Sequence, residues 1–368
     1  MKRSPLHQDH TDHGATFIEQ SGWQIPAHYG DASAEYSAVR KNVGIMDLSG
    51  RGKIRVTGED RVKWLQSIIS NDILPLAPGQ GIHSTLLTHK GKILAYFRVY
   101  QLGDALMVED VGSKEDTTFA TLRKFLLYGT KATMENCGET WGALLISGPK
   151  AFDVIRSAFG TDLSSLPMLS FEKLEIDGHP ALLIRSEETG ETDIEILLPS
   201  DGLRPAWDRL WTAGASLGLH RFGADTLEIL RVEAGLPKMG QDLSEEIVPP
   251  EANLEGKSFS LSKGCYPGQE VVARMDTYGS VRRRLVGFTL AEAVVPSSGA
   301  KLYSGDREVG WVSSAVLSPT LGKVIALGFP LRDFTKPGTE IAIDAEGRRI
   351  LATVHELPFI HAATSSPH

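Results

Sequence analysis

The last quarter of the chain constrains its fold most, because it contains only short apolar segments separated by glycine, proline and polar residues. No part of it has the 3.6-residue periodicity of a helix. Six short strands are predicted, at residues 285–290, 301–303, 308–314, 323–328, 340–343 and 349–356. Short strands with turns between them are typical of a small closed β-barrel. We therefore predict a barrel domain at residues 285–358, followed by a tail at 359–368.

Upstream of the barrel, predicted strands alternate with predicted helices in two successive regions, residues 28–138 and 139–284. The first should contain strands at 53–56, 82–87, 93–100 and 105–108, and helices at 34–42, 58–70 and one that starts at a Ser113–Asp116 capping box. The second should contain strands at 141–147, 171–176, 181–185 and 193–198, and helices at 149–159, 203–213 and 225–234. Antiparallel strands with helices on one face predict the α+β class.

Length and composition are those of an ordinary globular protein with two or three domains. The net charge of -8 argues against nucleic-acid binding by bulk electrostatics, and no apolar run is long enough to span a membrane. Two cysteines, Cys137 and Cys265, favour a reducing compartment, which we expect to be the cytoplasm. Residues 1–27 lack the apolar core of a signal peptide. Their histidines at 7, 10 and 13 are expected in a frayed polar tail rather than a metal site.

The stretch Leu261–Glu270 reads L-S-K-G-C-Y-P-G-Q-E. Its two glycines, Gly264 and Gly268, predict a tight turn that brings the backbone close to another segment. Lys263 stands two residues before Cys265, and a nearby cation favours the reactive thiolate. The alternative is a turn that holds a purely structural cysteine.

The octapeptide K-G-C-Y-P-G-Q-E resembles the signature of the YgfZ-type folate-binding proteins, which are relatives of the aminomethyltransferase (T-protein) of the glycine cleavage system. Other stretches are similar to T-proteins, among them L-Q-S-I-I-S-N-D-I, which ends at Ile73, and A-D-T-L-E-I-L-R-V-E-A-G-L-P at 224–237. The resemblance implies three domains arranged in a ring, with tetrahydrofolate in the central channel.

The sequence departs from the T-protein pattern at three places. T-proteins carry two adjacent acidic residues after a hairpin turn, one of them catalytic, whereas this chain has Ala95 and Tyr96 there. The folate-binding strand keeps its pterin-binding glutamate as Glu195 but has Glu188 in place of a tyrosine. No arginine near the C-terminus matches the one that T-proteins use.

The resemblance implies a set of site residues. Cys265 and Lys263 are the expected catalytic residues, and the expected folate-binding residues are Glu195, Arg231, Asn71, Tyr266 and Gln269. Two of these have a structural alternative: Glu195 as a solvated glutamate at a strand edge, and Arg231 as the partner of Glu228 or Glu233. The run of arginines at 282–284 is either a solvated strand or a contact for an anion, such as the folate glutamate tail or a partner protein.

Two functions from different classes follow from the resemblance. The first is a folate-binding accessory protein that helps to assemble or maintain iron–sulfur clusters, with client or assembly proteins as partners. The alternative is an aminomethyltransferase that passes a one-carbon unit to tetrahydrofolate. The missing acidic pair and the K-G-C-Y-P-G-Q-E motif both favour the first. A cluster carrier is a weaker third hypothesis, because two cysteines are fewer than the usual four thiolate ligands.

Overall fold

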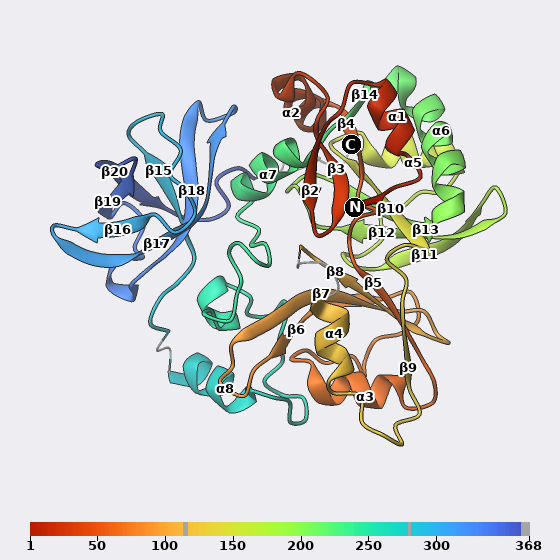
Figure 1. Cartoon of the computed structure of the whole chain (residues 1–368), viewed down its shortest axis with the longest axis horizontal. Coiled ribbons are helices and arrows are strands. Elements are labelled where there is room, and N and C mark those ends of the chain that lie inside the picture. The colour runs from red at the N-terminus through yellow and green to blue at the C-terminus, as the bar shows by residue number, and fades with distance from the viewer. Residues whose placement is uncertain (113–116, 279–280, 362–368) are drawn as a thin grey trace.

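The computed structural model describes residues 1–112, 117–278 and 281–361. It contains a five-stranded sheet, a six-stranded sheet and a closed six-stranded barrel, together with a small three-stranded sheet near the N-terminus. The two larger sheets lie on one side of the molecule and the barrel on the other (Figure 1). The prediction of an α+β fold with a C-terminal barrel is confirmed.

The five-stranded sheet is antiparallel and has the order β6-β7-β8-β5-β9. Its strands are β5 (Lys53–Thr57), β6 (Gly81–Leu87), β7 (Ile93–Gln101), β8 (Leu106–Asp110) and β9 (Thr133–Asn136). The helices of this unit are α3 (Arg61–Ile68) and α4 (Thr117–Arg123), and both are shorter than the sequence predicts. The predicted capping box at 113–116 lies outside the described residues.

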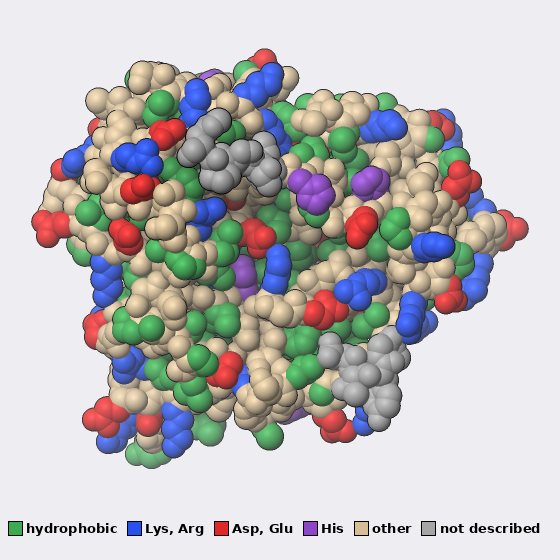
Figure 2. Space-filling view, turned by 180° about the vertical axis from the view of Figure 1, so that it is seen from behind, with side chains coloured by type: hydrophobic (Ala, Val, Ile, Leu, Met, Phe, Trp, Pro, Cys, Tyr) green, Lys and Arg blue, Asp and Glu red, His purple; other side chains and the backbone are tan. Residues whose placement is uncertain are grey.

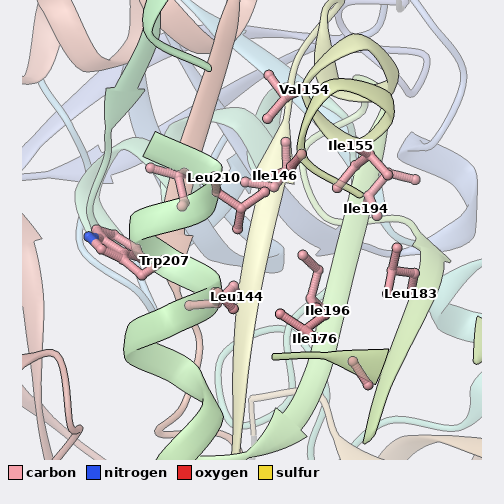
Figure 3. Close-up of a cluster of buried hydrophobic side chains, with 14 of the residues drawn as sticks. Leu144, Ile146, Val154, Ile155, Ile176, Leu183, Ile194, Ile196, Trp207 and Leu210 are labelled. Carbon is pink, nitrogen blue, oxygen red and sulfur yellow. The ribbon is translucent and has the colours of Figure 1, made fainter. Parts of the chain in front are cut away.

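The six-stranded sheet has the order β11-β12-β13-β10-β4-β14. Its strands are β4 (Val43–Asp47), β10 (Trp141–Ser147), β11 (Phe171–Ile176), β12 (His179–Ser186), β13 (Asp193–Pro199) and β14 (Leu219–Arg221). Helices α5 (Ala151–Phe159) and α6 (Leu203–Gly214) cover one face, with Ile194 and Ile196 of β13 in the core beneath them (Figure 3). Because side chains alternate along a strand, Glu195 points to the opposite face.

The N-terminal segment is structured, so the expectation of a frayed tail is wrong. It forms β1 (Lys2–Arg3), α1 (His7–Asp12), β2 (Thr16–Gln20), β3 (Trp23–His28) and α2 (Ala32–Lys41). Leu6 is fully buried against the core of the six-stranded sheet, which holds the segment in place. His10 is buried, with its Nε2 3.1 Å from Asp47 Oδ2 and its Nδ1 2.9 Å from the hydroxyl of Tyr29. The described residues contain no cluster of three or more metal-ligating side chains.

The chain reaches the barrel through α7 (Ala224–Glu233), an irregular stretch and α8 (Gln269–Tyr278), a helix that the sequence did not predict. All six predicted barrel strands are present: β15 (Val286–Leu290), β16 (Lys301–Ser304), β17 (Arg307–Ser318), β18 (Lys323–Pro330), β19 (Glu340–Ala345) and β20 (Arg348–His355). Single 3-10 turns occur at η1 (Ser200–Gly202), η2 (Ala215–Leu217), η3 (Pro249–Ala252) and η4 (Arg332–Phe334). Within the described ranges, no helix has the length and apolar character needed to cross a membrane.

Charged side chains of both signs are mixed over the face seen in Figure 2, without a large patch of either sign. A broad basic surface would be needed to bind nucleic acid through its phosphates. This face provides none.

Candidate functional site

A cavity of about 800 Å³ lies where the two large sheets, α7 and the segment before the motif meet. Its volume is within the range of small-molecule sites. Apolar and aromatic residues around it include Trp23, Ile25, Met46, Leu48, Tyr96, Val111, Leu227 and Leu357. The ionisable residues around it include Asp47, Arg51, Lys53, His83, Arg98, Asp110, Glu187, Glu188, Glu228, Arg231, Lys238 and Lys257.

The two residues that replace the acidic pair have different positions. Ala95 is buried in the core of the five-stranded sheet, whereas Tyr96 lies on the cavity wall. The ring of Tyr96 stacks on that of His83, with centroids 5.3 Å apart and planes 6° from parallel. Burial raises the pKa of Tyr96 above its usual value, so its phenol keeps its proton at neutral pH.

His83 lies on the cavity wall with unused hydrogen-bonding groups. It is 7% exposed, and neither ring nitrogen has a hydrogen-bond partner among the described residues. Burial, and then the charge of Arg98, lower the pKa of His83 to about 3, so the imidazole is neutral. A neutral imidazole offers one donor and one acceptor. Together, His83 and Tyr96 form a parallel ring stack in the cavity wall, with an unsatisfied donor and acceptor on the imidazole.

A buried ionic cluster forms the adjoining part of the wall. Arg51 binds Glu188 through two hydrogen bonds of 2.8 and 2.6 Å, and Arg98 lies 2.5 Å from the same carboxylate. Burial alone would raise the pKa of Glu188, but Arg51 and then Arg98 hold it at about 2. Glu188, the residue that replaces a tyrosine, is therefore an ionised carboxylate that two guanidinium groups neutralise.

Glu195 is fully buried behind this cluster and is not among the described residues that line the cavity. The interpretation of Glu195 as a solvated strand-edge residue is wrong, because β13 lies between β12 and β10 inside the sheet. Arg98 Nη1 is 3.2 Å from its carboxyl group. Burial, followed by the charge of Glu109 and a hydrogen bond to it, raises the pKa of Glu195 well above the usual range. Its environment thus favours the protonated form of Glu195 beside Glu109.

Arg231 lines the cavity, but its guanidinium group is fully engaged. Its N–H groups donate to Glu228, Asp242, the carbonyl of Leu236 and the hydroxyl of Ser314. This arrangement favours the structural interpretation of Arg231, as a link between α7 and the barrel, over its assignment to a folate carboxylate.

Asn71 connects two segments rather than facing the cavity. Its side-chain amide donates to the carbonyls of His83 and Lys257, both at 2.8 Å. It therefore fixes the backbone of β6 against the segment that leads to the motif.

Lys263 is buried beneath the motif loop and binds neutral dipoles. Its ammonium donates to the carbonyls of Gln66, Ile69 and Asn71 at 2.6, 2.7 and 2.9 Å, at the C-terminal end of α3. Burial lowers the pKa of Lys263 to about 8, and Asp72 opposes the change. Since these three carbonyls accept all three ammonium protons, the structure favours an anchoring role for Lys263 over a catalytic one.

Other motif residues also hold the loop. Tyr266 is buried and its hydroxyl donates to the carbonyl of Ser260, while Gln269 donates to the carbonyl of Lys263. Gly268 has φ +80°, and a Cβ there would lie 2.5 Å from the carbonyl oxygen of Thr88. The loop therefore contacts the β6–β7 turn directly, the close approach that the glycines predict. None of Lys263, Cys265, Tyr266 and Gln269 is among the described residues of the cavity wall.

The two cysteines differ in their exposure to solvent. Cys265 is exposed, whereas Cys137 is buried. Burial, and then Glu135, raise the pKa of the Cys137 thiol. Arg274, on the helix that follows the motif loop, pairs with Glu270 at 2.9 Å.

The sequence did not point to His83, Arg51, Arg98 or Glu109 as site residues. One signal for Arg98 was available, because a single charge within the otherwise apolar run of β7 indicates a buried ion pair. The sequence gives no comparable signal for His83, because a histidine at this position of β6 is also compatible with an ordinary buried residue.

The chain is similar to known proteins over nearly its whole length. Residues 6–257 match the GCVT N-terminal domain, and residues 283–361 match the glycine cleavage T-protein C-terminal barrel domain. An aminomethyltransferase from Saccharopolyspora erythraea is 31% identical over 97% of this chain and 98% of its own length. One from Geobacillus sp. is 30% identical over 99% and 100%. The crystal structure of glycine cleavage system aminomethyltransferase T from Bartonella henselae is similar with a TM-score of 0.86, at 25% identity over 98% of both chains.

Proposed function

This chain belongs to the glycine cleavage T-protein (GCVT) family, and from that premise we propose that it binds a reduced folate in the central cavity. Proteins of this family bind tetrahydrofolate, a carrier of one-carbon units. The observation that carries the proposal for this chain is the neutral ring stack of His83 and Tyr96 in the cavity wall, with both imidazole nitrogens unpartnered among the described residues.

The residues of the cavity fit a pterin. Its aminopyrimidinone ring presents donors and acceptors side by side, and its planar face suits stacking on an aromatic surface. We assign this ring to His83 and Tyr96 rather than to Glu195, because Arg98 and Glu188 stand between Glu195 and the cavity. This changes the assignment that the resemblance implies.

Beyond folate binding, the proposed cellular role is that of an accessory protein in iron–sulfur cluster assembly or maintenance, as in YgfZ-type proteins. It is supported by Tyr96, whose protonated phenol cannot act as the carboxylate that T-proteins use at this place. It is also supported by the K-G-C-Y-P-G-Q-E loop, in which buried anchors hold an exposed Cys265. In this proposal Cys265 provides the reactive thiol.

A second candidate function is aminomethyl transfer to tetrahydrofolate. The observation in its favour is that the relatives compared above carry the name aminomethyltransferase and match this chain over nearly its full length. An assay with aminomethyl-lipoyl carrier protein and tetrahydrofolate separates the two candidates. The accessory role predicts no ammonia release above background, whereas turnover close to that of a T-protein would establish the transferase.

The folate proposal is tested by calorimetry with tetrahydrofolate under anaerobic conditions. His83→Phe keeps the stacking surface but removes both nitrogens, so we expect binding at least about tenfold weaker, which corresponds to about 1.4 kcal/mol. Glu195→Gln is the matched control, because Glu195 is already neutral and an amide can still donate to Glu109. Equal affinity of His83→Phe and wild type, or a large loss in Glu195→Gln, would contradict the assignment.

A further inference from the structure

A second cavity, of about 560 Å³, lies at the end of the barrel where the chain arrives from α8. Its charged lining residues are Arg282, Arg283, Lys301, Glu246 and Glu308, and Trp311 forms part of its wall. It shares no described lining residue with the central cavity. We call it the barrel pocket.

Two arginines of the barrel pocket have no anionic partner in the part of the chain that the structure describes. Neither Arg282 nor Arg283 makes a side-chain hydrogen bond or ion pair with any residue in the described ranges, and the buried Nε of Arg283 is unpartnered. The neighbouring Arg284 differs, because it donates to Asn253 at 2.6 Å and lies 3.2 Å from Glu255. A buried guanidinium N–H without an acceptor is unusual in a folded protein and needs an explanation.

The position of the two arginines is fixed by the barrel. Arg283 forms a β-bridge with Leu331, and the amide of Arg332 donates to the carbonyl of Arg282 at 3.0 Å. The guanidinium carbon of Arg283 lies 4.5 Å from the centre of the Trp311 ring. Stacking on an aromatic ring restrains the guanidinium plane and leaves its N–H edge directed sideways. The guanidinium of Arg283 is therefore preorganised, whereas the exposed Arg282 is held through its backbone.

The remaining charges leave the barrel pocket positive. Lys301 is neutralised by Glu308 at 2.9 Å, so Glu246 alone stands against the two unpaired arginines. Local positive charge of this kind contrasts with the net charge of -8 of the whole chain. A planar guanidinium fork fits the two oxygens of a phosphate or carboxylate, and its hydrogen bonds to such an ion are stronger than those to a neutral acceptor.

We propose that the barrel pocket is a binding site for an oxyanion, a phosphate or a carboxylate group, held by Arg282 and Arg283. A phosphorylated metabolite and the carboxylates of a glutamate chain are two sources of the same chemistry. The proposal does not depend on the function of the central cavity.

The test is calorimetric titration of the full chain at low salt with two probes, inorganic pyrophosphate and triglutamate. We expect at least one to bind, with affinity reduced tenfold or more in Arg283→Gln and nearly unchanged in Arg284→Gln. Binding of pyrophosphate alone would identify phosphate as the ligand, and binding of triglutamate alone would identify carboxylate.

A thermal melt of each variant checks folding, and Arg282→Gln provides a second variant if Arg283→Gln does not fold. Binding of neither probe to wild type, or binding that survives when either pocket arginine is removed, would overturn the proposal.

Discussion

Two buried cations, Arg98 and Lys263, support the two functional regions of the molecule in different ways. Arg98, on the cavity wall, lies within 3.5 Å of three carboxyl groups, those of Glu188, Glu195 and Glu109. Lys263, under the motif loop, contacts three neutral carbonyls. The first therefore sets the charge of a cavity, whereas the second holds a backbone segment in place.

Because of this difference, the two parts of the proposed function, folate binding and thiol chemistry, depend on different regions of the molecule. The cavity wall couples charge to the ligand site, and its unused polar atoms at His83 point to a small molecule. The motif loop uses its polar side chains for anchoring and exposes Cys265. Ligand binding and thiol chemistry should therefore respond independently to mutation.

The largest expected effect is that of Arg98→Met. Removal of the guanidinium leaves Glu188 and its acidic neighbours buried without their central positive charge, which costs about 3–5 kcal/mol. Urea unfolding should show this as a lower free energy of unfolding. Arg55→Met is the control, because Arg55 pairs with Asp104 at the surface, where ion pairs contribute little. Similar losses in the two variants would mean that the buried cluster has no special role.

Lys263→Met should rank second, with a loss of about 2–3 kcal/mol, since three carbonyl acceptors lose a charged donor while no carboxylate is left unpaired. The measurement is again urea unfolding, with the exposed Lys131→Met as control. A small loss together with a large change in the rate of Cys265 alkylation would favour a direct effect of Lys263 on the thiol and contradict the anchoring role.

The comparison also shows which parts of the structure the sequence could predict. Periodicity and turn residues are local, so they identified the barrel strands and the tight approach at Gly268. The ion pair between Arg98 and Glu188 joins residues 90 positions apart, and nothing local specifies it. The anchoring role of Lys263 cannot be predicted from the sequence, because its hydrogen-bond acceptors are backbone carbonyls, which every residue has. The sequence therefore points only to its neighbour Cys265. Helix α1, in which Asp9 and His10 are buried, is not predicted because its charged and histidine residues resemble those of a tail.

The pH dependence of stability should reveal the neutral His83. Its pKa of about 3 in the folded state is below the usual 6.5, so between these values the unfolded chain binds more protons at this residue. Stability is therefore lost as the pH falls from 6.5 towards 3, by about 2 kcal/mol between pH 7 and pH 5. His83→Gln should lack this part of the acid sensitivity, whereas the exposed His89→Gln should retain it. Parallel pH profiles for wild type and His83→Gln would show that His83 titrates normally.

The smallest expected effect on stability is that of Cys265→Ser, although its effect on function should be the largest. The thiol is exposed and belongs to none of the hydrophobic clusters, so its replacement by a hydroxyl should change the free energy of unfolding by less than about 0.5 kcal/mol. Tetrahydrofolate affinity should also be unchanged, because Cys265 lies outside the described wall of the central cavity.

In cells that lack the protein, however, the serine variant should fail to restore the activity of iron–sulfur enzymes. Lys263→Met provides the complementary case, with an intact thiol on a loop that has lost its anchor. If Cys265→Ser rescues as well as wild type while Lys263→Met does not, the loop acts through its conformation and the thiol has no chemical role.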